Sequence, residues 1–164
     1  MELRGVDELM DLLGACRGVG RPDTPVDLHE HSLQTAALLR RGRPADKELQ
    51  IAGLVHDIGH VLRPGTPHGS PELHGSRGTQ GTHEHADLGA DAVRPLLGER
   101  VSRLVRLHTH PRPAGPGPLA DDALTLRQAH ETARVPGLDA GVLEDWRTLL
   151  ELLAARRSRT GAVD

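Results

Sequence analysis

The aromatic content of this 164-residue chain is a single tryptophan, Trp146, with no phenylalanine and no tyrosine. Its core must therefore be built from leucine, valine, isoleucine and alanine, and Trp146, which lies among leucines, is expected to pack in that core. Strands favour aromatic and β-branched residues, whereas leucine and alanine are good helix formers. The composition therefore predicts an all-α protein. The length fits one domain that can bury a core without disulfides or a structural metal.

Charge and cysteine content narrow the class of protein further. The net charge is −3 with neutral histidine, and no basic block is present that would follow a phosphate backbone, so no nucleic-acid partner is expected. No apolar run approaches the roughly 18 residues of a membrane span, and the N-terminus lacks the pattern of a signal peptide. The lone Cys16 cannot form an internal disulfide and indicates a reducing compartment. We predict a cytoplasmic protein with no membrane contact.

Apolar residues recur at helical spacing in segments that glycine and proline separate. The predicted helices cover about 6–13, 26–40, 84–97, 119–134 and 139–157, with one more after Gly98 and one that begins at Ala45-Asp46 and continues through His60. Asp46 is a good N-cap residue for the last of these. The expected fold is a single domain over 1–164, with a helical core of about 2–157, a flexible loop at 63–83 rich in Gly, Pro and His, and a frayed tail at 158–164.

The central motif is the segment Gly53-Leu-Val-His56-Asp57-Ile-Gly59-His60. On a helix, adjacent His56 and Asp57 point about 100° apart, which lets one residue bind a metal while the carboxylate reaches across as a bridge. His60 lies one turn beyond His56 on the same face. Gly53 and Gly59 each cost a helix about 1 kcal/mol relative to alanine, which indicates close backbone packing around a site.

Histidine is the abundant polar residue, with eleven in the chain. His31, His85 and His108 fall on other predicted helices, where one pocket can collect them. Imidazole with carboxylate suits Fe, Mn, Zn, Co or Ni, so the ligand type alone does not choose the metal. The remaining histidines outside this set are interpreted as solvated or structural, namely His29, His68, His74, His83 and His110.

This ordered set of residues resembles the HD superfamily, whose pattern is a His, a His-Asp pair, further His and a final Asp. The resemblance runs from about Val26 to Trp146 and implies a single HD-domain bundle of about six or seven helices. Within the superfamily the chain is most similar to the mixed-valent di-iron oxygenases, which include organophosphonate-cleaving enzymes and, more distantly, myo-inositol oxygenase. The stretches that carry this similarity are 30–34, 54–60, 85–90 and 105–112.

The resemblance implies two metal ions, Fe(II) and Fe(III), with Asp57 as the bridge and Asp57 and His60 as catalytic residues. The implied metal ligands are His31, His56, Asp57, His85, His108 and His130. His130 stands where the family has its final Asp, and Glu131 or Asp122 could supply that negative charge instead. The implied substrate-binding residues are His60, Arg112, Arg127 and Gln34.

The loop before the first ligand helix departs from the family. The organophosphonate enzymes place a Tyr and a Glu there, whereas this chain has Arg21 and Thr24 near those positions. We therefore expect a different substrate or a different gating of the site.

The leading hypothesis is an oxygenase that uses molecular oxygen to cleave the C–P bond of a small hydroxy-phosphonate and release phosphate. The alternative is a metal-dependent phosphohydrolase for a small phosphoester or nucleotide, working with Mn, Co or Ni. A third reading is a domain that binds a phosphorylated ligand without turnover, and the His130 replacement favours it. All three predict a small anionic ligand.

Overall fold

The computed structural model describes residues 1–21, 24–62, 79–110 and 115–161, and these residues form an all-α fold, as predicted. The helices are α1 (Val6–Ala15), α2 (Leu28–Gly42), α3 (Lys47–Val55), η1 (Ile58–His60), α4 (Thr79–Leu97), α5 (Glu99–Leu107), α6 (Pro118–Thr132), η2 (Leu143–Trp146) and α7 (Arg147–Thr160), where η marks a 3-10 helix. Outside the helices, the only other regular secondary structure in these ranges is an isolated β-bridge between Arg21 and Thr24. Across the same ranges, no helix is both long and apolar enough to cross a bilayer.

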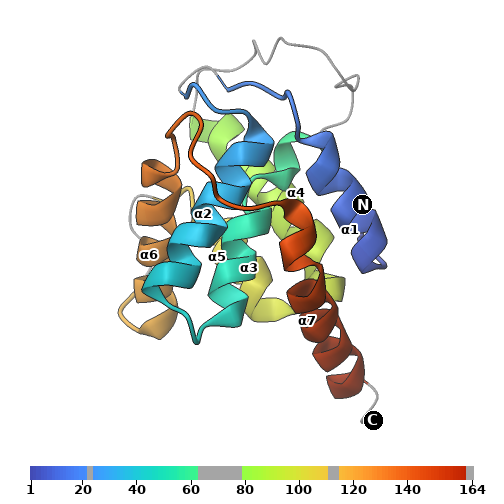
Figure 1. The fold of residues 1–164 in the computed structure, drawn as a ribbon. Helices are drawn as coiled ribbons and strands as arrows, with labels where there is room; N and C mark the ends of the chain where they lie inside the picture. The colour runs from blue at the N-terminus through green and yellow to red at the C-terminus, as the bar shows by residue number, and fades with distance from the viewer. Residues whose placement is uncertain (22–23, 63–78, 111–114, 162–164) are drawn as a thin grey trace.

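Helix α3 lies at the centre of the bundle and contacts α2, α5, α6 and α7. Every residue from Leu49 to Val55 is buried, which is the pattern of a helix surrounded on all sides. Figure 1 shows α6 along one edge of the bundle and α1 with α7 on the other. Trp146 is buried in the shared core, as predicted, and the guanidinium of Arg40 lies 3.8 Å from the centre of its ring.

Two aspartates fix the starts of the central helices. Asp27 caps α2 by accepting a hydrogen bond from the Glu30 amide at 2.8 Å, and it also accepts one from the Gly18 amide at 2.8 Å. Asp46 caps α3 by accepting from the Leu49 amide at 3.1 Å, which confirms the predicted N-cap. Such caps satisfy backbone amides that have no partner inside the helix.

The helix that was predicted to continue through His60 ends at Val55. Asp57 follows in a non-helical turn, and the 3-10 helix η1 then forms with a hydrogen bond from the His60 amide to the Asp57 carbonyl at 3.1 Å. The prediction of one helical face for His56 and His60 was therefore wrong. The turn reorients Asp57 and His60 relative to α3, which a regular helix would not allow.

Three further boundaries differ from the predictions. Helix α4 begins at Thr79, inside the predicted loop, while 63–78 lie outside the described residues. The predicted helix at 139–157 is divided into η2 and α7, and α7 continues to Thr160. The start of the predicted frayed tail is therefore helical, and 162–164 lie outside the described residues.

Candidate metal centre

Six histidines surround the fully buried carboxylate of Asp57, three on each oxygen. The nitrogens nearest to Oδ2 are Nε2 of His56 at 3.2 Å, Nε2 of His31 at 3.4 Å and Nδ1 of His130 at 4.0 Å. Those nearest to Oδ1 are Nε2 of His108 at 3.3 Å, of His85 at 3.4 Å and of His60 at 3.9 Å. Asp57 therefore separates two groups of ring nitrogens and offers one oxygen to each.

Glycines bring the supporting elements close enough to form the centre. A Cβ on Gly59 would lie 1.8 Å from the backbone oxygen of His85, and a Cβ on Gly89 would lie 3.3 Å from the Gly59 nitrogen. A Cβ on Gly53 would lie 2.5 Å from the Leu39 side chain. These short distances confirm the predicted close backbone packing. Because Gly59 and Gly89 have no side chain, η1 can lie directly against α4.

Backbone carbonyls set the orientation of three of the rings. Nδ1 of His31 donates to Ala133 at 2.7 Å, Nδ1 of His56 to Gly53 at 2.7 Å and Nδ1 of His108 to Val105 at 2.6 Å. A carbonyl can only accept, so Nδ1 carries the hydrogen in each ring and Nε2 of the neutral imidazole keeps a lone pair. Metal-binding histidines are commonly held by this kind of hydrogen bond.

The group on Oδ2 has the spacing of a metal site. Nε2 of His31 and Nε2 of His56 lie 3.2 Å apart, and Nδ1 of His130 lies 2.9 Å from both. These three contacts cannot all be hydrogen bonds, because two of the nitrogens carry lone pairs. Metal–nitrogen bonds of about 2.1 Å place neighbouring ligands roughly 3 Å apart, so one cation would satisfy all three.

The group on Oδ1 contains buried polar atoms without a hydrogen-bond partner among the residues that the structure describes. They are Oδ1 of Asp57, Nε2 of His60, both ring nitrogens of His85 and Nε2 of His108. The ring of His60 stacks on that of His85 with centroids 3.9 Å apart. Leaving such atoms unpaired is costly, and a second cation bound to Oδ1 would give the Nε2 atoms that face it a partner. The arrangement therefore fits two cations bridged by Asp57.

Burial keeps the rings neutral and ready to bind. It lowers the pKa of His31 to about 4 and that of His60 to about 3, and it also lowers the pKa of His56 and of His130. Burial disfavours the charge of Asp57, but neighbouring His56 and Arg21 hold its pKa well below the usual range. At neutral pH these four imidazoles are consequently neutral and Asp57 is ionised, the protonation states that metal binding requires.

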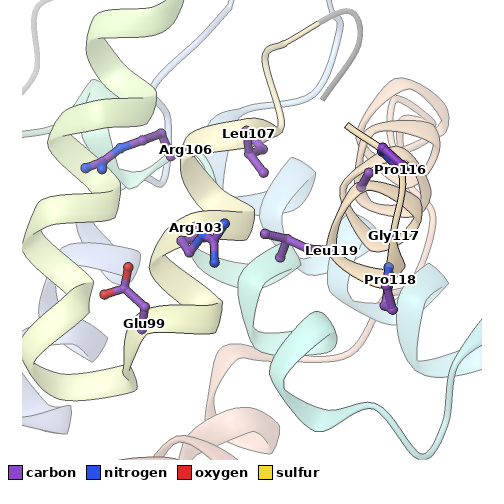
Figure 2. Close-up of a pocket in the computed structure, with 9 residues that line it drawn as sticks. Glu99, Arg103, Arg106, Leu107, Pro116, Gly117, Pro118 and Leu119 are labelled. Atoms are coloured by element: carbon purple, nitrogen blue, oxygen red, sulfur yellow. The ribbon is translucent and has the colours of Figure 1, made fainter. Parts of the chain in front are cut away.

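A pocket of about 150 Å³ leads from the surface to this centre. It is lined by Arg21, His85, His108, Thr109, Arg127, His130, Glu131 and Arg134. A larger pocket of about 470 Å³ lies between α5 and the start of α6 (Figure 2). Arg103, Arg106 and Leu119 line that second pocket, and none of the candidate metal ligands does.

Several predicted site residues lie elsewhere. Asp122 pairs with Arg100 at 2.9 Å and with Arg43 at 3.5 Å, and it belongs to neither group around Asp57. Its assignment as an alternative ligand is therefore corrected. Glu131 is exposed at the pocket rim, outside the two groups, and accepts a hydrogen bond from Arg127 at 3.0 Å. The geometry thus favours His130 as the last ligand.

The predicted substrate residues have different positions. Arg127 lines the pocket and also donates to the His110 carbonyl at 3.1 Å. Gln34 is buried, and its amide bonds both backbone groups of Val135, at 2.7 and 3.2 Å, so it holds the chain after α6 and is not among the residues that line the pocket. Arg112 lies outside the described residues.

Two arginines of the pocket had no assigned role at the sequence level. Arg21 donates a hydrogen bond to Oδ2 of Asp57, although the two residues lie 36 positions apart. The departure from the family pattern pointed to the loop that contains Arg21, but not to its contact with Asp57. Arg134 has a weak signal, because in the predicted helix 119–134 it would share the face of His130 and Arg127, but α6 ends at Thr132 and Arg134 lies just beyond it.

A model of the HD domain family matches residues 28–144, and the chain belongs to this family of metal-dependent hydrolases and oxygenases. The match runs from the start of α2 into η2 and includes every candidate ligand. A "Probable inositol oxygenase" from Oryza sativa subsp. japonica is 38% identical over 58 residues. That alignment covers 35% of this chain and 19% of the relative, so the chain matches about a fifth of the length of that protein.

Proposed function

We propose that this chain is a di-iron oxygenase that cleaves the C–P bond of a small hydroxy-phosphonate and releases phosphate. The observation that supports it is the division of six histidines between the two oxygens of Asp57. A buried carboxylate with a set of ring nitrogens on each oxygen is arranged to bridge two metals. When bound, a pair of irons would supply the redox chemistry with molecular oxygen that side chains cannot provide.

The residues divide into two sets of ligands. One iron would be held by His31, His56, His130 and Oδ2 of Asp57. The other would be held by Oδ1 of Asp57 with His85 and with His108, whose Nε2 lies 3.3 Å from Oδ1. Nε2 of His60 lies 3.9 Å from Oδ1 of Asp57 and has no hydrogen-bond partner among the described residues. It can therefore hydrogen-bond a substrate oxygen or complete the second ligand set.

The pocket supports a small anionic substrate. Its volume of about 150 Å³ admits a molecule of only a few heavy atoms, and Arg127 stands at its wall. A guanidinium can bind a phosphonate through two parallel hydrogen bonds, which orients the reacting carbon as well as neutralising charge. We expect Arg112 to take part in the same recognition.

The similarity to a probable inositol oxygenase favours oxygenase over hydrolase within the family. Inositol and a hydroxy-phosphonate share a hydroxyl-bearing carbon that can be oxidised. The two differ in charge, and the arginines of the pocket favour the anion.

A second candidate function is a metal-dependent phosphohydrolase. The observation that favours it is the single carboxylate of the centre, since His130 supplies a neutral donor beside Asp57. Fewer negative ligands stabilise the reduced metal and disfavour a stable ferric ion. Mn, Co or Ni at the same residues would generate hydroxide for attack on a phosphoester.

The decisive experiment combines metal analysis with an oxygen requirement. The protein is purified with iron under limited oxygen, its iron content and EPR spectrum are measured, and small 1-hydroxyalkylphosphonates are then added with and without oxygen. We expect about two irons per chain, a mixed-valent signal, and phosphate release only with oxygen. Anaerobic turnover of simple phosphoesters would establish the hydrolase instead. Bound metal without either activity would indicate a binding domain.

A further inference from the structure

A cationic side chain already contacts the carboxylate that would bridge the metals. The guanidinium of Arg21 donates to Oδ2 of Asp57, and the Arg21 side chain is only 13% exposed. Arg21 precedes α2, so it enters from a different segment than His31 and His56, which approach the same oxygen. The charge of the buried carboxylate is thereby balanced by one arginine.

This contact competes with metal binding. Oδ2 is the oxygen on which His31, His56 and His130 converge, so a cation held by those nitrogens would share it with the guanidinium. Two positive charges repel strongly at such a separation when both are shielded from water. Arg21 must therefore leave Oδ2, at least in part, when the group is filled.

The pocket offers Arg21 a second position. Arg21 already lines it together with Arg127 and Arg134, and the carboxylate on the wall is Glu131. Three guanidiniums therefore line the pocket beside one carboxylate, and Glu131 accepts a hydrogen bond from Arg127 at 3.0 Å.

We propose that Arg21 exchanges partners: it is the counter-ion of Asp57 before metal binding, and afterwards it binds the anionic group of the substrate together with Arg127 and Arg134. This inference rests on the proposed function and deepens it. It favours an anion, a phosphonate or phosphate monoester, over a neutral polyol as the substrate. A centre with a single carboxylate is itself positively charged when filled, which strengthens the same preference.

The first half of the test measures metal affinity. Chelator-stripped wild type and the Arg21→Gln and Arg21→Lys variants are titrated with Mn²⁺ by calorimetry, with circular dichroism to verify folding. Because Mn²⁺ no longer has to displace a cation, we expect Arg21→Gln to bind it about tenfold more tightly, and Arg21→Lys to resemble wild type. The matched control is Arg103→Gln, from the pocket between α5 and α6, which should not change the affinity.

The second half measures anion affinity of the Mn²⁺-loaded proteins with inorganic phosphate, and with myo-inositol as a neutral probe. We expect Arg21→Gln to weaken phosphate binding about tenfold, Arg21→Lys to retain most of it, and inositol to bind more weakly than phosphate to wild type. Equal phosphate affinity in wild type and Arg21→Gln, or unchanged Mn²⁺ affinity, would overturn the role of Arg21 alone. Failure of the wild type to bind Mn²⁺ or iron would instead overturn the proposed function and this inference together.

Discussion

Polar residues gather at both ends of the same three helices, and the two clusters behave in opposite ways. At the amino-terminal ends of α3, α5 and α6, Arg100 donates to Asp46, Glu48 and Asp122 at distances between 2.7 and 3.0 Å. At the carboxyl-terminal ends of these helices, His56, His108 and His130 join three histidines from α2, η1 and α4 around Asp57, and these rings present lone pairs and unpartnered atoms to one another. The first cluster is satisfied by its own residues, and the second is not.

This difference separates a stabilising network from a binding site. A buried polar group is tolerated when protein atoms complete its hydrogen bonds, as around Arg100. Where the protein leaves such bonds incomplete at the end of a pocket, the missing partner is a ligand. The following predictions test whether the two ends of the helices are functionally as distinct as their geometry.

The largest contrast is expected between two aspartates, one from each cluster. Asp57→Asn removes the negative charge shared by both groups and should lower activity by about 1000-fold or more, with loss of at least one metal per chain. Asp122→Asn should leave the metal content at the wild-type level. Metal analysis of both purified variants and a turnover assay measure this. Equal metal loss in the two variants would contradict the assignment of only the Asp57 cluster to metal binding.

A methyl group at the carboxyl-terminal cluster should be almost as damaging. In Gly59→Ala the new Cβ would lie 1.8 Å from the His85 backbone oxygen, so η1 and α4 must separate. We expect a loss of about 4 kcal/mol in the free energy of unfolding, and a weaker second metal site. Gly14→Ala in α1, where a Cβ meets nothing within 4 Å, is the control and should be neutral or slightly stabilising. Urea denaturation of both variants decides the matter.

The two clusters should also lose stability in different pH ranges once metal is removed. The pKa of His31 falls from 6.5 to about 4 on folding. Between these two pH values the ring is protonated in the unfolded chain but remains neutral in the native protein. The contribution of His31 to stability is therefore complete above pH 6.5, and it decreases by on the order of 3 kcal/mol down to pH 4. Hydrogen bonding to Arg100 lowers the pKa of Asp46 below 3.8, so that contribution is lost only at still lower pH.

Urea denaturation of the chelator-stripped protein between pH 8 and pH 4 measures this dependence. His31→Gln should make it less steep, because one of the titrating rings is gone, while His56, His60 and His130 still contribute. A wild-type stability that stays constant down to pH 4 would contradict the burial of neutral imidazoles.

The smallest effect is expected at the satisfied cluster. Arg100→Gln removes the guanidinium that joins three carboxylates, but the Arg100 side chain is one-third exposed, so water screens much of the loss. We expect about 1 kcal/mol of destabilisation and unchanged metal content. Thermal unfolding and metal analysis test this, and a loss of metal in Arg100→Gln would show that the two clusters are coupled.

Much of the fold follows from local signals in the sequence. Apolar residues at helical spacing, and the cap at Asp46, identified most of the helices. Local signals failed where tertiary contacts act on the backbone. Nothing in the segment from His56 to His60 indicates that α3 ends at Val55, because the turn depends on the contact of Gly59 with α4.

The sequence by itself predicted the residues that gather at Asp57, because a His-Asp pair in an apolar, glycine-flanked segment marked the centre and the resemblance to the HD superfamily supplied the further histidines. Only the tertiary structure decided how these residues are shared: which histidines face each oxygen of Asp57, that Asp122 belongs to Arg100, that Gln34 holds the chain at Val135, and that Arg21 reaches the bridging carboxylate. Helical periodicity gives the face on which a residue lies, but it does not specify which distant segment packs against that face.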